Sequence, residues 1–123
     1  MNIIDSSGWV EILANTNRAT LYKPAVESGK ILVPSIVVFE VCKYLRLRLG
    51  NVPSETVGAF LQQYPIIDLT GSIAEEAADF SVAHKVPMAD SIIYVTAKKY
   101  KATLWTQDVD LKDLPGVKFF PKL

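Results

Sequence analysis

The chain has 123 residues, which fits one compact domain, and half of them are apolar, enough to build a core without disulfides or a structural metal. Its 13 basic and 13 acidic residues balance. This excludes a general polyanion binder, so any nucleic-acid contact must come from a local basic patch.

The first half of the chain alternates between strand-like and helix-like segments. Residues 2–5 are a short apolar run ending in an acid, which predicts a first strand, and Ser6 or Ser7 can cap the helix that follows. A second helix is predicted from about residue 18 to 27, ending at a glycine. A second strand is predicted at 30–33, followed by a long helix over 36–49.

The second half continues the alternation. A helix is predicted to begin at Pro53 and to end before Pro65. The remaining elements are a third strand at 66–69, helices over 72–85 and 87–101, and two further strands at 102–106 and 117–120. Strands separated by helices favour parallel pairing with right-handed crossovers, so we expect an α/β fold with a mainly parallel five-stranded sheet between helices. We treat residues 1–123 as a single domain.

Four acids fall at one edge of this predicted sheet. Asp5 ends the first strand, and Asp108 follows the fourth. Glu40 lies near the start of the helix after the second strand, and Asp90 lies in the first turn of the helix before the fourth. Ligands in parallel sheets gather at the carboxyl ends of the strands, so we expect these side chains to meet.

The surroundings of these acids favour a metal site. Asp5, Glu40 and Asp90 stand among apolar residues, with no lysine or arginine within two positions. Burying carboxylates without a partner is costly, and Mg²⁺ or Mn²⁺ is the cation that oxygen ligands suit. Taken singly, Asp5 and Asp90 could be helix caps. Asp110 competes with Asp108 for the fourth position.

Other catalytic chemistries find little support. A histidine pair is excluded because His84 is the single histidine, and its spacing with Phe80 and Ile73 favours a structural role. Cys42 lies among apolar residues and predicts a core thiol that suits a reducing compartment. The N-terminus lacks the features of a signal peptide and no apolar run is long enough to span a membrane, so we expect a cytoplasmic protein.

Four segments with these acids follow one another along the chain. They are Asp5-Ser6-Ser7, Pro34-Ser35 through Phe39-Glu40-Val41, Ala89-Asp90-Ser91-Ile92-Ile93 with Thr96-Ala97, and Leu104-Trp105-Thr106-Gln107-Asp108-Val109-Asp110-Leu111. In this order they resemble the motifs of the PIN-domain family, and length and layout are similar to its VapC-type toxins.

The resemblance implies a three-layer fold with sheet order 3-2-1-4-5 and a Mg²⁺- or Mn²⁺-dependent ribonuclease that is the toxin of a toxin–antitoxin pair. It also implies a homodimer and a cognate antitoxin that holds the enzyme inactive. The implied catalytic and metal-binding residues are Asp5, Glu40, Asp90 and Asp108, supported by Ser7 and Thr106, with Asp110 as the alternative fourth acid. Gln107 departs from the basic residue that many relatives carry there.

RNA contacts require local positive charge. Lys43 and Arg46 on the helix that carries Glu40 are the leading candidates, because Lys43 lies three residues after the acid. Further candidates are Arg48, Lys98, Lys99 and Lys101. The same helix is apolar around most of its circumference, which predicts that an antitoxin segment or a second subunit covers it.

Two other functions remain open at the level of sequence. A phospho-acceptor receiver domain has a similar size and layout, and Asp68 in a strand-like run could serve as its acceptor. The first strand, however, ends in a lone acid, and Glu40 and Asp90 would have no role. A non-catalytic RNA- or protein-binding module of the same fold is the second alternative, against which the four intact acids argue.

Overall fold

The computed structural model describes residues 1–50 and 53–122. Three parallel strands form one ladder in the order β1 (Asn2–Ile4), β4 (Thr103–Thr106) and β5 (Val117–Phe119). Two very short parallel strands, β2 (Val33–Pro34) and β3 (Ile66–Ile67), form a second ladder. A parallel bridge between Asn2 and Ile31 joins the two ladders. The strands therefore run in the order 3-2-1-4-5, as the resemblance implies, and the predicted α/β class is confirmed.

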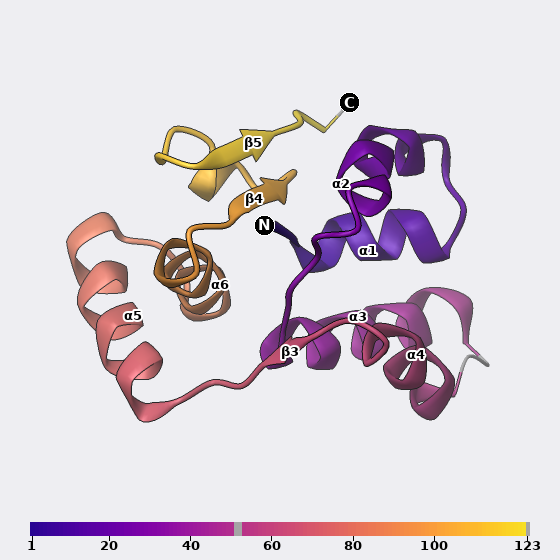
Figure 1. The fold of residues 1–123 in the computed structure, drawn as a ribbon, viewed down its shortest axis with the longest axis horizontal. Coiled ribbons are helices and arrows are strands. Elements are labelled where there is room, and N and C mark those ends of the chain that lie inside the picture. Colours follow the sequence, from indigo (N-terminus) through magenta and orange to yellow (C-terminus); the bar gives the residue numbers. More distant parts are fainter. Residues whose placement is uncertain (51–52, 123) are drawn as a thin grey trace.

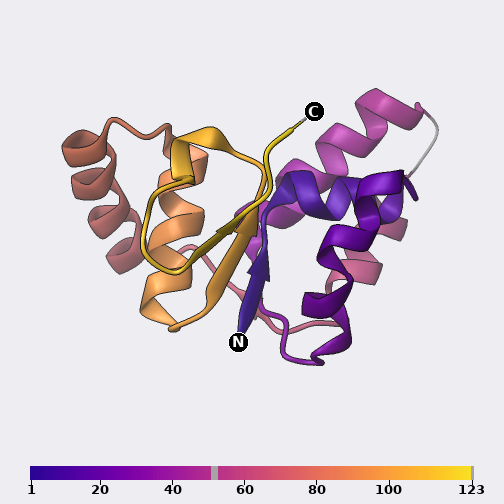
Figure 2. The same ribbon diagram turned by 90° about the horizontal axis from the view of Figure 1, so that it is seen from above.

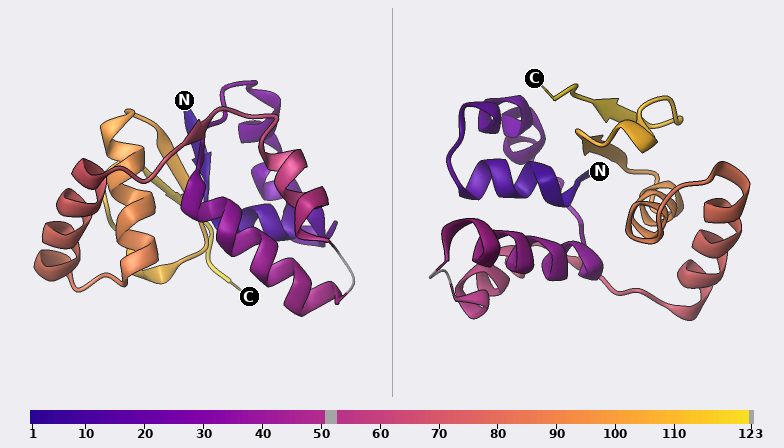
Figure 3. Two further views of the ribbon diagram at one scale, coloured as in Figure 1. Left: turned by 90° about the horizontal axis from the view of Figure 1, so that it is seen from below. Right: turned by 180° about the vertical axis from the view of Figure 1, so that it is seen from behind.

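Helices surround these strands (Figure 1). The α-helices are α1 (Ser6–Leu13), α2 (Lys23–Glu27), α3 (Ser35–Leu49), α4 (Ser54–Leu61), α5 (Gly71–His84) and α6 (Met88–Lys99), and two 3₁₀ helices are η1 (Asn17–Tyr22) and η2 (Val109–Leu111). Figure 2 shows α5 and α6 on one side of the strands, and α1 and α2 on the other. Figure 3 shows α3 alongside α1, with which it is in contact.

Two local predictions were wrong. The helix predicted from about residue 18 to 27 is a 3₁₀ helix followed by the short α2, with Pro24 in the first turn of α2. Proline has no backbone N–H and clashes with the preceding turn, so a continuous α-helix cannot pass through it. The cap of α1 is Asp5, the alternative that the sequence also allows, rather than Ser6 or Ser7, because the Asp5 carboxylate accepts the Ser6 N–H at 2.7 Å.

The core lies between the strands and both groups of helices. Trp9, Tyr22 and Leu104 are fully buried, and every residue of α6 from 91 to 97 is buried. Gly8 allows α1 to approach its neighbours, since a Cβ there would lie 2.6 Å from both Ile4 Cγ2 and Tyr22 Cε1. This close packing fixes the start of α1, and with it the position of Asp5.

Helix α3 is only partly covered. Val37, Val41 and Leu45 are buried, whereas Phe39 is 64% and Leu47 75% exposed. The apolar side chains of α3 that the core does not cover therefore form an exposed apolar surface. None of the helices in the described part of the chain has the length and apolarity that a membrane span requires.

Candidate metal centre

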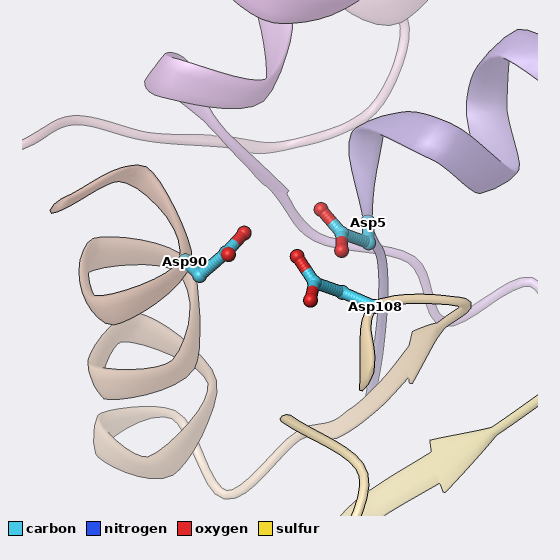
Figure 4. Close-up of side chains that lie close together, drawn as sticks. All are labelled: Asp5, Asp90 and Asp108. Carbon is cyan, nitrogen blue, oxygen red and sulfur yellow. The ribbon is translucent and has the colours of Figure 1, made fainter. Parts of the chain in front are cut away.

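Three acids converge at the carboxyl end of the central strands. Asp5 follows β1, Asp108 follows β4, and Asp90 lies in the first turn of α6. Each offers a carboxylate oxygen, and these three oxygens all lie within 4.8 Å of one another. Figure 4 shows the three side chains pointing toward a common centre. The parallel topology thus brings together residues that are 85 and 18 positions apart in sequence.

Asp5 is the most enclosed of the three, with 3% of its surface exposed. Its Oδ1 accepts the Ser6 N–H at 2.7 Å, and its Oδ2 accepts the Thr106 hydroxyl at 2.6 Å. Burial raises the pKa of Asp5 to about 6, although both hydrogen bonds oppose the shift; the charges of Glu40 and Asp108 raise it further. The two hydrogen bonds hold the Asp5 carboxylate in place, but they do not fully offset the cost of burying its negative charge.

Asp90 is half-buried, and its pKa is raised to about 8. Burial is the largest cause, followed by the hydrogen-bonding contact and the negative charge of Asp108, and then by the charges of Asp5 and Glu40. Without a cation, these acids cannot all ionise cheaply at neutral pH. The electrostatics of the cluster therefore favour the binding of a cation.

An open cavity of about 640 Å³ adjoins this trio. Besides the three aspartates, its lining includes Glu40 from α3 and Ser7 from α1. Glu40 is half-buried and accepts the Tyr44 hydroxyl at 3.1 Å, but it lies outside the group of three. Glu40 can therefore contact a ligand in the cavity, although it is not one of the three convergent carboxylates.

Comparison with known families decides the identity of this fold. The sequence model of the PIN domain matches residues 3–117. The chain belongs to the PIN domain family. This membership excludes the receiver domain, and Asp68, its suggested acceptor, is an exposed residue just after β3.

Solved structures share the fold of this PIN domain at low identity. A chain of a toxin–antitoxin complex from Klebsiella pneumoniae is 21% identical with a TM-score of 0.80, covering 96% of each chain. VapC20 from Mycobacterium tuberculosis, described as a sarcin–ricin loop cleaving toxin, is 18% identical with a TM-score of 0.80, covering 94% of this chain and 95% of that one. VapBC2 from Rickettsia felis, bound to a promoter DNA fragment, gives a TM-score of 0.69 at 18% identity, covering 98% and 97%. Comparison with curated protein sequences gives no match.

The supporting residues of this PIN domain divide into two groups. Thr106 is buried, donates to Asp5 and accepts the Asp108 N–H at 2.9 Å, so it ties two acids together. The Ser7 hydroxyl is buried and has no hydrogen-bond partner among the described residues, although Ser7 lines the cavity. Asp110 is exposed, donates its N–H to Asp108 and does not line the cavity. Of the two competing acids, Asp108 belongs to the cluster.

Of the basic side chains that the sequence offers as RNA contacts, Arg48 alone lines this cavity among the described residues. Lys43 and Arg46 are exposed and do not line it. Arg18, Arg48 and Lys122 do. Lys98 and Lys101 border a second cavity of about 330 Å³, and Lys99 pairs with Glu76 at 3.0 Å. Arg18 and Lys122 had no local sequence signal, because only the fold places them near the acids.

The donor set fits a hard divalent cation. Three convergent carboxylates supply the oxygen ligands that Mg²⁺ and Mn²⁺ prefer. Within residues 1–50 and 53–122, none of Asp5, Asp90, Asp108 and Glu40 forms a salt bridge to a lysine or arginine. The negative charge of the cluster is thus left for a cation to neutralise. His84 stacks on Phe80 at 4.5 Å, away from this centre.

Proposed function

We propose that this PIN domain is a Mg²⁺- or Mn²⁺-dependent endoribonuclease and the toxin of a toxin–antitoxin pair. The observation that carries the proposal is the convergence of the Asp5, Asp90 and Asp108 carboxylates within 4.8 Å at an open cavity. Without a cation, the pKa values of Asp5 and Asp90 are raised, as expected for buried, crowded carboxylates at a site that binds a cation.

In this proposal, Asp5, Asp90 and Asp108 hold the cation. Mg²⁺ or Mn²⁺ held by these residues would supply positive charge and would lower the pKa of a bound water toward neutrality. Thr106 keeps the Asp5 carboxylate oriented through its 2.6 Å hydrogen bond. Glu40 lies at the wall of the same cavity, where its carboxylate orients water or accepts a proton during hydrolysis. Ser7 contributes a buried hydroxyl to the same wall.

RNA is the proposed substrate because the cavity is open and combines these acids with basic side chains. A single strand or a loop fits such an open site better than a duplex, whose phosphates and grooves are presented on a rigid surface. The VapC20 structure, with its sarcin–ricin loop cleaving activity, supports RNA as the class of substrate.

The test is cleavage of total RNA, read out as a map of cut sites. We expect cleavage with Mn²⁺ or Mg²⁺, none with EDTA, and none with Asp5→Ala in either condition. Asp79→Asn, an exposed acid on α5 outside the cavity, serves as the charge-matched control and should retain full activity. A folded protein that binds RNA but leaves it intact with both metals would identify a non-catalytic binding module instead.

For the partner, we propose that a cognate antitoxin covers the open apolar surface of α3 around Phe39 and Leu47. The toxin–antitoxin complexes among the structural neighbours support a partner of this class. We further propose that the protein is cytoplasmic and forms a homodimer. Light scattering tests the dimer, and co-expression with the product of an adjacent antitoxin gene tests the partner: Phe39→Ser should weaken the complex without reducing RNA cleavage.

A further inference from the structure

The cavity has a second, basic side that the metal centre does not use. Glu11 on α1 pairs with Arg18 at 3.5 Å and with Arg48 at 3.6 Å, so one carboxylate bridges two guanidinium groups. The Glu11 side chain is 13% exposed and also accepts the Thr16 hydroxyl at 3.2 Å. All three charged residues line the cavity that contains the acidic trio.

The two arginines are engaged to different degrees. Arg18 is 21% exposed and donates to the Gln107 side chain and, at 2.9 Å, to the Pro121 carbonyl oxygen. Arg48 is 51% exposed, and Glu11 is its one ion-pair partner in the described ranges 1–50 and 53–122. A guanidinium carries five N–H donors, so Arg48 retains donors for a ligand, whereas Arg18 is committed to the protein.

The charge of this group points to an anion. Two guanidinium groups against one carboxylate leave one net positive charge. The ion pair and side-chain hydrogen bonds of Arg18 to described residues go to Glu11, Gln107 and Pro121, and none goes to the acidic trio. One cavity therefore offers carboxylates for a cation and, separately, a guanidinium for an anion.

We propose that Arg48 contacts a backbone phosphate of the RNA strand that is cleaved, and that Glu11 and Arg18 are positioning residues for it. The proposal rests on the ribonuclease function, because it takes RNA as the ligand. Arginine binds phosphate in a planar, bidentate manner that suits recognition of a strand's backbone without regard to its bases. Because Arg48 and the acidic trio line the same cavity, an RNA strand lying in it meets the trio at one phosphate and Arg48 at another.

The test compares two arginines of the same helix. Arg48→Gln and Arg46→Gln each remove one positive charge from the last turn of α3, but Arg46 does not line the cavity. With a short single-stranded RNA and Mn²⁺, we expect Arg48→Gln to raise KM about tenfold with kcat within about twofold. In EDTA, fluorescence anisotropy should show weaker RNA binding and a salt-dependence slope smaller by ~0.7. Arg46→Gln should match the wild type in both measurements.

A third variant separates charge from geometry. Arg48→Lys keeps the ion pair with Glu11 and the positive charge, so it should keep the salt slope while recovering only part of the affinity. Equal melting temperatures of the variants will show that they fold. Equal KM values for Arg48→Gln and Arg46→Gln, or a fall in kcat alone, would overturn the proposal. If the wild type fails to cut RNA but Arg48→Gln alone weakens RNA binding, the ribonuclease function is wrong and the phosphate contact stands.

Discussion

Removing the charge of Asp90 should stabilise the metal-free protein. Its pKa is raised from 3.8 to about 8, mainly by burial and by Asp108, so ionisation opposes folding. Each pKa unit corresponds to ~1.4 kcal/mol, which gives ~5 kcal/mol at pH 7.5 for a fully buried group. Because water reaches part of this side chain, we take about half of that, ~2 to 3 kcal/mol, for Asp90→Asn. For a domain of this size, the melting temperature should rise by ~5 to 10 °C.

The gain must depend on pH in one direction. A carboxyl with a higher pKa in the folded state than in the unfolded chain favours folding at low pH, and this contribution is lost as the pH rises through the folded value. The advantage of Asp90→Asn should therefore be close to zero near pH 4 and complete above pH 8, since the two pKa values are 3.8 and about 8. Asp5, with a pKa of about 6, destabilises both proteins as the pH rises from 4 to 6.

Thermal melts in EDTA at several pH values measure this effect. Asp79→Asn is the matched control, because it removes an exposed acid from α5 that no described residue pairs with in a salt bridge. Saturating Mn²⁺ should reverse the order, because the wild type gains stability from binding and Asp90→Asn loses a ligand. A variant that melts at or below the wild type in EDTA at pH 7.5, or a control that gains equally, would refute the electrostatic reasoning.

Three further changes separate the roles of neighbouring residues. Asp108→Asn should lower kcat at least ~100-fold in the RNA cleavage assay, while Asp110→Asn, which keeps its backbone N–H, should stay within about threefold; equal losses would contradict the assignment. Thr106→Val removes the hydrogen bond that lowers the pKa of Asp5, so Mn²⁺ affinity by calorimetry should fall more at pH 6 than at pH 8, and a uniform loss would contradict this cause. Gly8→Ala places a Cβ 2.6 Å from two side chains and should cost ~1 to 3 kcal/mol in urea unfolding, whereas an unchanged midpoint would show that the packing relaxes.

The acidic cluster could be foreseen because topology alone dictates it. Asp5 and Asp108 follow neighbouring parallel strands, and Asp90 opens the helix that leads into β4, so any fold with this alternation brings them to the same edge. The sequence favours Asp108 over Asp110 because Asp108 directly follows the strand, but it leaves the choice open, since that choice depends on η2, a single 3₁₀ turn in which Asp108 accepts the Asp110 N–H. Glu40 reaches the same cavity but stays outside the trio, a distinction set by how α3 packs.

Most of the basic side of the cavity could not be foreseen, although Arg48 is among the candidates that the sequence offers. Arg18 and Gln107 are 89 positions apart, and Arg18 and Pro121 are 103 apart, so no local pattern signals their contact. Lys43 is a leading candidate because it lies three residues after Glu40. At ~100° per residue, Lys43 and Arg48 lie on opposite sides of Glu40 around α3, ~60° and ~80° away, so sequence distance does not tell which side faces the cavity. In the structure, the arginine at the end of α3 reaches the cavity instead.

The acidic side of the cavity is held more firmly than the basic side, so the two sides differ in how far they can move around a ligand. The Asp5 N–H donates to the Trp105 carbonyl oxygen at 2.9 Å, so this acid is itself a rung between the central strands. The backbone of Asp5 cannot shift unless β1 and β4 separate, and the packing of the core opposes that separation. The Arg48 side chain, in contrast, is half-exposed near the end of α3, where it can change rotamer at little cost. If the cavity binds a metal ion and RNA as proposed, the three aspartates would stay fixed while Arg48 adjusts to RNA of different shape.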